Sequence, residues 1–540
     1  MTEPEYEFVI VGAGSAGCVL ANRLAAGGRD RVLLLEAGGP DSSPWIRLPV
    51  GYGRTFTDPR FNWMYESEPD PGIANRTTYC PRGKVLGGSS SINAMVYVRG
   101  QHADFDDWRA AGNPGWGWQD VLPYFRKLED HAWGADEYHG AGGPVHVSDI
   151  AREAHPLCRR FIEACGRIGI RYTRDFNGAV MDGAGTWQMT IRKGLRVSSA
   201  SAYLRPARRW RNLEIRTRAQ ATRVLFTGRR ATGVEFLADG ALGRATARKA
   251  VILAAGAINS PQLLQLSGVG DAALLQRFGI PVVQHAAAVG QGLQDHLAVS
   301  YCYRSRVPTL NDELYPLLGK VRAALHYAWN RGGPLAMSVN QAGAFVRSDP
   351  KLERANLQLY FNPLSYTAAP GPRSRVTNPD PYSAFLIAFN SCRPTSRGAV
   401  AIRSPDPLAQ PAIRTNFLST AGDLADICAG ARLLRRIAAT APLADVVESE
   451  LLPGSGVASD EELLQDFRAR AGPVFHCACT CAMGPDATRA VVDHRLRVHG
   501  VEGLRVADAS VFPAITSGNT NAPVLMLGER AADLILEDCG

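Results

Sequence analysis

The glycine-rich turn near the N-terminus constrains the fold more than any other part of the chain. Residues 7–39 predict a buried strand, a turn with the pattern Gly12-x-Gly14-x-x-Gly17, a helix, and a second buried strand that ends at Glu36. Gly12 permits the tight turn, Gly14 lets the backbone approach a pyrophosphate at the helix N-terminus, and Gly17 lets helix and strand pack closely. Glu36 is placed to accept hydrogen bonds from ribose hydroxyls and to repel a 2′-phosphate. This βαβ unit predicts a dinucleotide site that disfavours NADP, and its N-terminal position favours FAD over NAD.

The composition is typical of a globular protein and argues against several functional classes. The chain has 540 residues, of which 46% are hydrophobic and 20% charged, enough for a large core in two domains. The net charge of +8 is modest, and aromatic residues do not alternate with basic runs as in nucleic-acid-binding proteins. The start of the chain lacks the features of a signal peptide, and no apolar run reaches the ~18 residues of a membrane span. We therefore expect a cytoplasmic protein without a transmembrane segment that binds no nucleic acid, and peripheral membrane contact stays open.

Hydrophobic patterning divides the chain into two interleaved domains. Strand–turn–helix patterns recur at 249–270 and 503–536, whereas strand-like and helical pieces mix between 298 and 469. The predicted fold is a Rossmann-like α/β FAD-binding domain, discontinuous in sequence, with an α+β substrate-binding domain that contains an antiparallel sheet. The predicted FAD-binding segments are 1–142, 196–297 and 470–540, and the predicted substrate-binding segments are 143–195 and 298–469.

Five stretches of the chain resemble the glucose–methanol–choline (GMC) family of FAD-dependent oxidoreductases. Besides the N-terminal turn, they are "PRGKVLGGSSSINAMVYVRG" (81–100), "GAINSPQLLQLSGVG" (256–270), "VGQGLQDHL" (289–297), and the pair "FHCACTCAMGP" and "DASVFPAITSGNTNAPVLM" near the C-terminus. They occur in the family's order and span nearly the whole chain. The chain is most similar to the branch with choline dehydrogenase-like and primary-alcohol dehydrogenases. The resemblance implies an enzyme that oxidises a CH–OH donor with FAD.

The resemblance also implies which residues hold FAD. Asn93 and Ala94 would lie near the reactive edge of the flavin, and Val224 would contact adenine through its backbone, although a core valine would fit the same pattern. Some members attach FAD covalently through a histidine just before that asparagine; here the position is Ile92, so we expect non-covalent FAD. The implied cofactor residues are Gly12, Gly14, Ser15, Ala16, Gly17, Glu36, Ala37, Val85, Gly87, Gly88, Asn93, Ala94, Val224, Asp508, Ala509, Asn519, Thr520 and Pro523.

Alcohol oxidation requires a base for the hydroxyl proton, and histidine suits this role near neutral pH. By resemblance His476 is the base and Asn521 is its partner, which holds the substrate oxygen. Many relatives have a second histidine at the partner position. We expect a structural role for His296, at the point where the chain leaves the FAD-binding domain.

Three cysteines alternate with small residues after His476, in "HCACTC". If this stretch is an extended strand, Cys477, Cys479 and Cys481 share one face and His476 lies on the other. Alternate positions on one strand are poorly spaced for tetrahedral zinc or for a disulfide. The pattern therefore favours buried packing over a metal or redox role, and we predict no metal ion.

The substrate is predicted from the absence of a carboxylate after "LQDH". Choline-acting relatives carry a glutamate near "LQDH" that can anchor a quaternary ammonium, whereas this chain continues with Leu297, Ala298 and Val299. An uncharged aliphatic or benzylic primary alcohol therefore fits better than choline, which is the alternative. Two interpretations are open for the aromatic residues of 298–370: they line an apolar pocket, or they belong to the core. We expect core positions for most of them; they are Tyr301, Tyr303, Tyr315, Trp329, Tyr360 and Phe361.

The electron acceptor and the assembly are less constrained. The acceptor can be a quinone, a soluble carrier or oxygen, and the likeness to choline dehydrogenases favours a dehydrogenase over an oxidase. The family's scaffold also serves hydroxynitrile lyases and light-driven fatty-acid photodecarboxylases, and a flavin-binding protein without catalysis is a further alternative. The sequence leaves a homodimer open.

Overall fold

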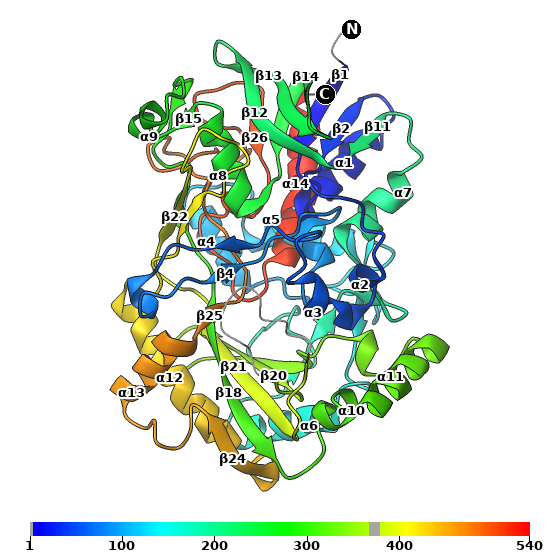
Figure 1. Cartoon of the computed structure of the whole chain (residues 1–540), viewed down its shortest axis with the longest axis vertical. Helices are drawn as coiled ribbons and strands as arrows, with labels where there is room; N and C mark the ends of the chain where they lie inside the picture. The colour runs from blue at the N-terminus through cyan, green and yellow to red at the C-terminus, as the bar shows by residue number, and fades with distance from the viewer. Residues whose placement is uncertain (1–3, 367–377, 540) are drawn as a thin grey trace.

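Two seven-stranded sheets, one above the other in Figure 1, organise the molecule. The computed structural model describes residues 4–366 and 378–539. The upper sheet takes its strands from the beginning, middle and end of the chain, and the lower sheet takes its strands from the segments between them. The chain therefore crosses between the two layers several times, as a discontinuous domain requires.

The upper sheet is a parallel sheet extended by an antiparallel ribbon. Its order is β11-β2-β1-β14-β13-β12, and β26 pairs with β14. Neighbours from β11 through β1 to β14 and β26 run parallel, whereas β13 runs antiparallel to both β12 and β14. The strands are β1 (Glu5–Val11), β2 (Val32–Leu35), β11 (Leu213–Arg216), β12 (Ala219–Thr227), β13 (Arg230–Ala238), β14 (Ala241–Leu253) and β26 (Leu504–Val506). The predicted Rossmann-like α/β architecture is confirmed.

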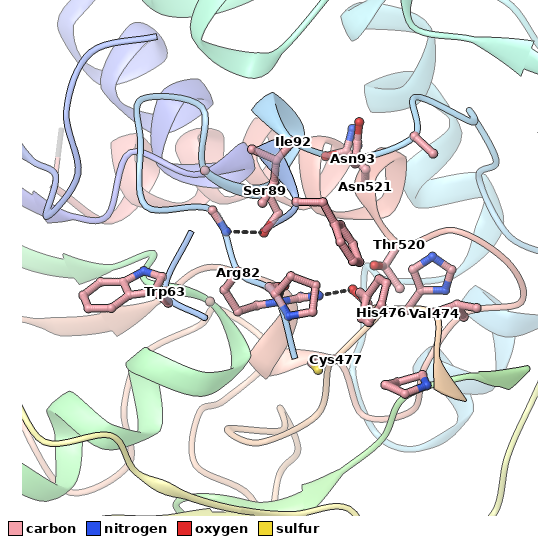
Figure 2. Close-up of a pocket in the computed structure, with 18 of the residues that line it drawn as sticks. Trp63, Arg82, Ser89, Ile92, Asn93, Val474, His476, Cys477, Thr520 and Asn521 are labelled. Carbon is pink, nitrogen blue, oxygen red and sulfur yellow. Dashed lines mark hydrogen bonds between the residues drawn. The ribbon is translucent and has the colours of Figure 1, made fainter. Parts of the chain in front are cut away.

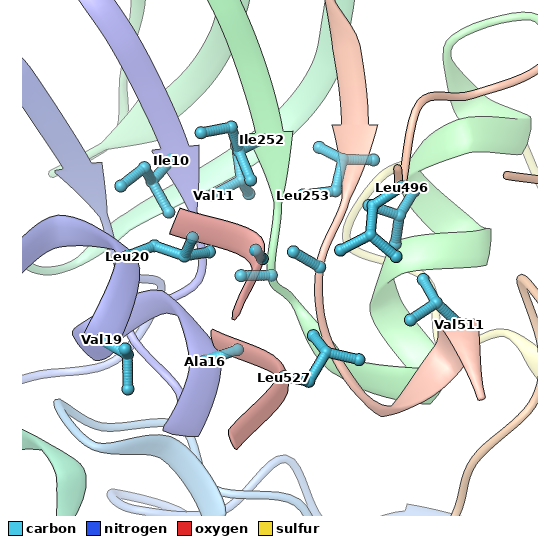
Figure 3. Packing of buried hydrophobic residues seen from close by; sticks show 14 of the residues in the cluster. Ile10, Val11, Ala16, Val19, Leu20, Ile252, Leu253, Leu496, Val511 and Leu527 are labelled. Atoms are coloured by element: carbon cyan, nitrogen blue, oxygen red, sulfur yellow. The ribbon is translucent and has the colours of Figure 1, made fainter. Parts of the chain in front are cut away.

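The centre of the upper sheet is apolar throughout because helices cover it. All of β2 and the last four residues of β1 are buried, as expected of parallel strands covered on both faces. Helix α1 (Ser15–Ala25) packs against α14 (Asn521–Cys539), and Figure 3 shows Val19 and Leu20 of α1 and Leu527 of α14 among the buried residues of this core. A Cβ atom on Gly17 would lie 1.8 Å from the Gly12 carbonyl oxygen, so this contact between turn and helix needs glycine.

The lower sheet is antiparallel, in the order β24-β18-β21-β20-β19-β7, with β25 also pairing with β18. Helices α6 (Pro156–Arg167), α12 (Ala421–Ala438) and α13 (Asp460–Arg470) pack on its outer face. The strands are β7 (Gly183–Thr186), β18 (Leu297–Ser305), β19 (Ala342–Val346), β20 (Leu357–Asn362), β21 (Ala384–Ser391), β24 (Val447–Leu452) and β25 (Gly472–Pro473). The predicted antiparallel substrate-binding sheet is confirmed.

Alternation along these strands creates two different faces. In β18, Leu297, Val299 and Tyr301 face the helices and belong to the lower core, whereas Ala298 and Ser300 face the upper sheet. Successive side chains of a strand point to opposite faces, so one face of the sheet is committed to packing. The other face is free to line a cavity between the two layers.

One short sheet crosses the predicted domain boundary. β22 (Gly398–Ala401) and β23 (Ala412–Arg414) come from the predicted substrate-binding segment, yet β22 pairs with β17 (Gln291–Leu293) of the upper domain. The predicted boundaries at 298 and 469 thus do not separate all contacts. Among the described residues, no helix has the length and apolar character needed to cross a membrane.

Candidate active site

A cavity of about 1100 Å³ lies between the two sheets, larger than most ligand pockets of ~300–1,000 Å³. The glycine turn and the end of β2 form its upper wall, and the inner face of the lower sheet forms its lower wall. Most residues predicted from the sequence meet here. Those that line it are Gly12, Gly14, Ser15, Ala16, Glu36, Ala37, Gly88, Asn93, Ala94, His476, Asp508, Ala509, Asn519, Thr520 and Asn521.

Five of the predicted cofactor residues do not line the cavity: Gly17, Val85, Gly87, Val224 and Pro523. Val224 fits the alternative of a core valine, because its side chain belongs to the upper core and its amide donates to Ser267 Oγ at 2.8 Å. Earlier in the same strand, 219–221 do line the cavity.

His476 reaches the cavity from a loop, and the extended strand assumed for "HCACTC" is not present. Phe475 and Cys479 have positive φ angles of 69° and 74°, which break the extended conformation and its strict alternation. The loop is held instead by single bridges, such as that between Ala478 and Gln294. The Arg82 guanidinium donates to the carbonyl of Phe475, next to His476, as drawn in Figure 2.

The three cysteines beside His476 are free thiols buried in the protein. Cys477 donates to Asp295 Oδ2 at 3.1 Å and Cys479 to Gln294 Oε1 at 3.3 Å. Burial raises the pKa of Cys479 to about 12, so its thiol is uncharged at neutral pH. These contacts fit the packing role expected from the sequence.

Asn519, not Asn521, is the hydrogen-bond partner of His476. Asn519 Nδ2 donates to His476 Nε2 at 3.1 Å, and Gln358 Nε2 donates to Asn519 Oδ1 at 3.3 Å. Asn521 is the first residue of α14, and its Oδ1 accepts a hydrogen bond of 2.7 Å from Ser15 Oγ. It thereby joins the last helix to the N-terminal glycine turn. The contact with His476 that was predicted for Asn521 is therefore made by the asparagine two residues before it.

His296 contacts His476 directly. The two Nδ1 atoms lie 2.9 Å apart, and His296 Nε2 lies 2.9 Å from the carbonyl oxygen of Cys392. A carbonyl can only accept, so Nε2 of a neutral His296 carries the hydrogen and its Nδ1 accepts from His476 Nδ1. His476 Nε2 is then left with its lone pair, on the side of Asn519. The role of His296 is thus more specific than the structural one expected.

The charge state of this pair follows from its environment. Burial lowers the pKa of His476 well below its usual value, with smaller contributions from His296 and Arg82. Burial likewise lowers the pKa of His296 to about 4. Both imidazoles are therefore neutral at pH 7, and His476 Nε2 can accept a proton.

Asp295 is a supporting residue that the sequence did not single out. Its Oδ1 accepts from the His476 amide at 2.7 Å while Oδ2 accepts from the Cys477 thiol. Burial raises the pKa of Asp295 to about 6, although the nearby Arg82 lowers it. The polar run "QDH" between Leu293 and Leu297 was the available signal, because three adjacent polar residues in a buried segment need partners.

A second buried cluster of possible metal ligands is tied together by hydrogen bonds and ion pairs within the protein. Glu129, His131 and His139 present ligand atoms close together, but His139 bonds Glu129 and Asp175 through its two nitrogens. Burial lowers the pKa of His139, and hydrogen bonds to Asp175 and Glu129 outweigh it and raise the pKa to about 9. A protonated imidazole cannot ligate a metal ion, and Arg99 pairs with the same Glu129.

Two family models together match most of the chain. The model of the GMC oxidoreductase N-terminal domain matches residues 6–298, and that of the C-terminal domain matches residues 394–528. The chain belongs to the GMC oxidoreductase family. A mitochondrial choline dehydrogenase of Mus musculus is 44% identical over 98% of this chain and 89% of its own. An alcohol dehydrogenase (acceptor) of Pseudomonas putida is 39% identical over 98% of this chain and 96% of its own.

A solved pyridoxine 4-oxidase from Mesorbium loti superposes with a TM-score of 0.88 at 32% identity, covering 98% of each chain. These relatives establish an oxidoreductase that acts on alcohols, and GMC oxidoreductases bind FAD. The cavity fits that cofactor. Glu36 accepts from the amides of Ala13 and Gly38 at 2.9 and 2.8 Å at the cavity wall. A Cβ atom on Gly88 would lie 2.7 Å from Gly14 Cα, so two glycine turns pack together without side chains.

The aromatic residues of the substrate-binding segment are distributed differently from the prediction in two cases. Tyr301, Tyr303 and Phe361 belong to the lower core, as expected for most of them, and Tyr360 lines the cavity. Tyr315 and Trp329 are neither core nor lining; both are exposed on the surface. The cavity is also lined by Tyr366 and Tyr382 of this segment and by Phe56, Trp63 and Val474 from other parts of the chain.

Proposed function

We propose that this GMC oxidoreductase oxidises uncharged primary alcohols, aliphatic or benzylic, to aldehydes, with His476 as the base and non-covalent FAD. The observation that carries the proposal is the lone pair on His476 Nε2, oriented by His296 and directed at Asn519 in the cavity. FAD, when bound, supplies the acceptor for the hydride that leaves the carbinol carbon. Ile92 lines the cavity and its side chain forms no bond to a flavin, which supports non-covalent binding.

The protein's own groups handle the hydroxyl. His476 Nε2 and Asn519 Nδ2 bond each other directly at 3.1 Å, so an alcohol oxygen that replaces this contact can bond to both groups. His476 takes the hydroxyl proton, and Asn519 donates to the oxygen and cannot compete for that proton. Because His476 is buried and neutral, it is ready to accept the proton near neutral pH.

The cavity wall supports an uncharged substrate. Ala298 and Val474 line the cavity, and Ala298 lies in the stretch after "LQDH" where choline-acting relatives carry a glutamate. Without a carboxylate there, a quaternary ammonium loses a counter-charge that would offset its desolvation. Small alkyl and aryl groups need no such partner.

Choline is the second candidate. Choline dehydrogenases of mouse and human are each 44% identical to this chain, and Asp380, Tyr366 and Tyr382 line the cavity. A carboxylate and aromatic faces are the groups that bind a quaternary ammonium. The test is the ratio of kcat/KM for choline to kcat/KM for butanol in Ala298→Glu. Under this alternative the ratio should rise less than threefold, whereas under our proposal it should rise about tenfold.

We further propose a dehydrogenase that passes electrons to a quinone or soluble carrier, acting in the cytoplasm. The likeness to the Pseudomonas putida alcohol dehydrogenase (acceptor) supports an acceptor other than oxygen. A homodimer is compatible with this proposal.

The test is the visible spectrum of the purified protein, recorded without oxygen before and after addition of butanol, benzyl alcohol or choline. Bleaching by the two uncharged alcohols, without recovery in air, is the expected result. Rapid recovery in air would make the protein an oxidase, and bleaching by choline alone would favour the second candidate. A yellow protein that no alcohol bleaches would contradict the proposal and leave a lyase, a light-driven enzyme or a flavin-binding protein.

A further inference from the structure

Helix α11 (Leu317–Asn330) exposes large apolar side chains along its whole length. Of its fourteen residues only Ala323 is buried, while Leu317 is 79%, Leu325 66% and Trp329 92% exposed. Six of the fifteen exposed large hydrophobic residues among the described residues lie between Tyr315 and Trp329. Single exposed apolar residues are ordinary, but a contiguous set indicates a surface that binds something apolar.

The exposed residues form one stripe directed away from the protein. At 3.6 residues per turn, the apolar side chains that make up this stripe fall within an arc of about 140° around the helix axis. Ala323, the buried residue, is on the opposite side of the helix. The members of the stripe are Leu317, Leu318, Val321, Ala324, Leu325, Ala328 and Trp329. Figure 1 shows α11 at the edge of the lower half of the molecule, beside α10 (Leu310–Leu314).

Basic side chains border this stripe. On the same helical projection, Arg322 follows one edge of the arc and Lys320 lies beyond the other, and both are exposed. Residues 314–331 contain Lys320, Arg322 and Arg331 but no aspartate or glutamate. An apolar stripe with Trp and Leu, bordered by Lys and Arg, is typical of a helix that lies in the interface of an anionic bilayer.

The buried side of α11 is connected to the cavity wall through a small core. Ala323 packs in a small core with Leu310, Leu314 and Leu364, and Tyr366 packs against that core. Tyr366 also lines the cavity. A surface that bound α11 would therefore lie beside the substrate-binding half of the molecule.

We propose that α11 docks the protein on the surface of an anionic lipid bilayer, with its apolar stripe in the interface and Lys320 and Arg322 at the head groups. Charge argues for lipid over a second copy of the chain, because two copies would bring equal basic borders together. Docking would place the lower half of the cavity near the membrane, where apolar alcohols and quinones concentrate. The lipid binding itself does not depend on the proposed reaction.

The test is sedimentation of the FAD-loaded protein with vesicles of phosphatidylcholine alone or with roughly one third phosphatidylglycerol. The wild type should bind the anionic vesicles, and Leu325→Glu should weaken that binding at least tenfold. Leu242→Glu is the matched control, because Leu242 is 60% exposed in β14, far along the chain from α11, and it should bind as the wild type does. Flavin content and alcohol-driven bleaching in detergent-free buffer should be unchanged in both variants.

Charge variants test the borders of the stripe. Lys320→Gln and Arg322→Gln should each weaken binding to anionic vesicles about fivefold at low salt, the effect of roughly one basic residue at a membrane surface. Added salt should reduce the difference.

Two outcomes would overturn the proposal. One is a correctly folded, yellow wild type that does not sediment with anionic vesicles. The other is a dimer in solution that Leu325→Glu dissociates while vesicle binding is the same in wild type and variant. The second outcome would assign the stripe to contact between two copies.

Discussion

The upper wall of the cavity is built from backbone, whereas the lower wall and the catalytic group depend on side chains. Gly12, Gly14 and Gly88 approach the cavity in short turns, and each turn is one contiguous stretch of sequence. His476 contacts His296 and Asn519, which come from two other segments of the chain. His296 lies more than a hundred residues before His476 in the sequence. A motif written in adjacent residues can be read from sequence, but a hydrogen-bonded chain across the fold cannot.

The largest effect should come from His476→Ala, which tests the lower part of the cavity without changing the glycine turns of the upper wall. We expect the rate of flavin reduction by alcohol to fall about 10³-fold, because the variant loses its general base, while bound FAD remains. Anaerobic stopped-flow absorbance measures the rate, and the ratio of visible to protein absorbance measures FAD. His285→Ala, at an exposed histidine, is the control. An unchanged rate in His476→Ala would show that another group takes the proton.

The next effect should distinguish the two asparagines. Asn519→Ala should slow flavin reduction about 10²-fold, as expected for loss of a donor to the reacting oxygen. Asn521→Ala removes the contact with Ser15 Oγ and should slow reduction less than tenfold, with its main effect on FAD retention. If Asn521→Ala slowed the reaction more than Asn519→Ala at full FAD occupancy, the assignment of the partner would be wrong.

A smaller effect is expected at His296, which acts through His476. His296→Leu removes the acceptor for His476 Nδ1 and should slow flavin reduction about tenfold, because His476 is no longer held in one tautomer. His296→Asn can present an oxygen near the position of Nδ1 and should recover much of the rate. Equal rates in the two variants would mean that His296 only fills space.

The smallest effect concerns pH. Burial lowers the pKa of His476 well below its usual value, so the base stays unprotonated as pH falls through 6.5, the ordinary value for histidine. We expect kcat/KM to change less than about twofold between pH 7.5 and 6 and to decline only at more acidic pH. A decline centred near pH 6.5 would indicate a solvated base and would contradict the buried pair.

The sequence by itself determined the βαβ unit and the two kinds of sheet, and it singled out His476 as the proposed base. These features depend on local patterns: apolar runs, glycines at fixed spacing, and stretches that resemble one family. The rejection of a cysteine metal site also followed from local spacing, although the loop around Cys479 is not the strand that the argument assumed.

Tertiary structure decided which way each side chain points and which residues distant in sequence become its hydrogen-bond partners. Asn519 and Asn521 are two residues apart in sequence, but Asn521 begins α14 and is drawn to Ser15 by the packing of that helix against α1. Val224 lies in the predicted strand yet faces the core. The exposure of Trp329 could not be read from its apolar surroundings in sequence, because the apolar pattern of a helix is the same whether protein or another surface covers it.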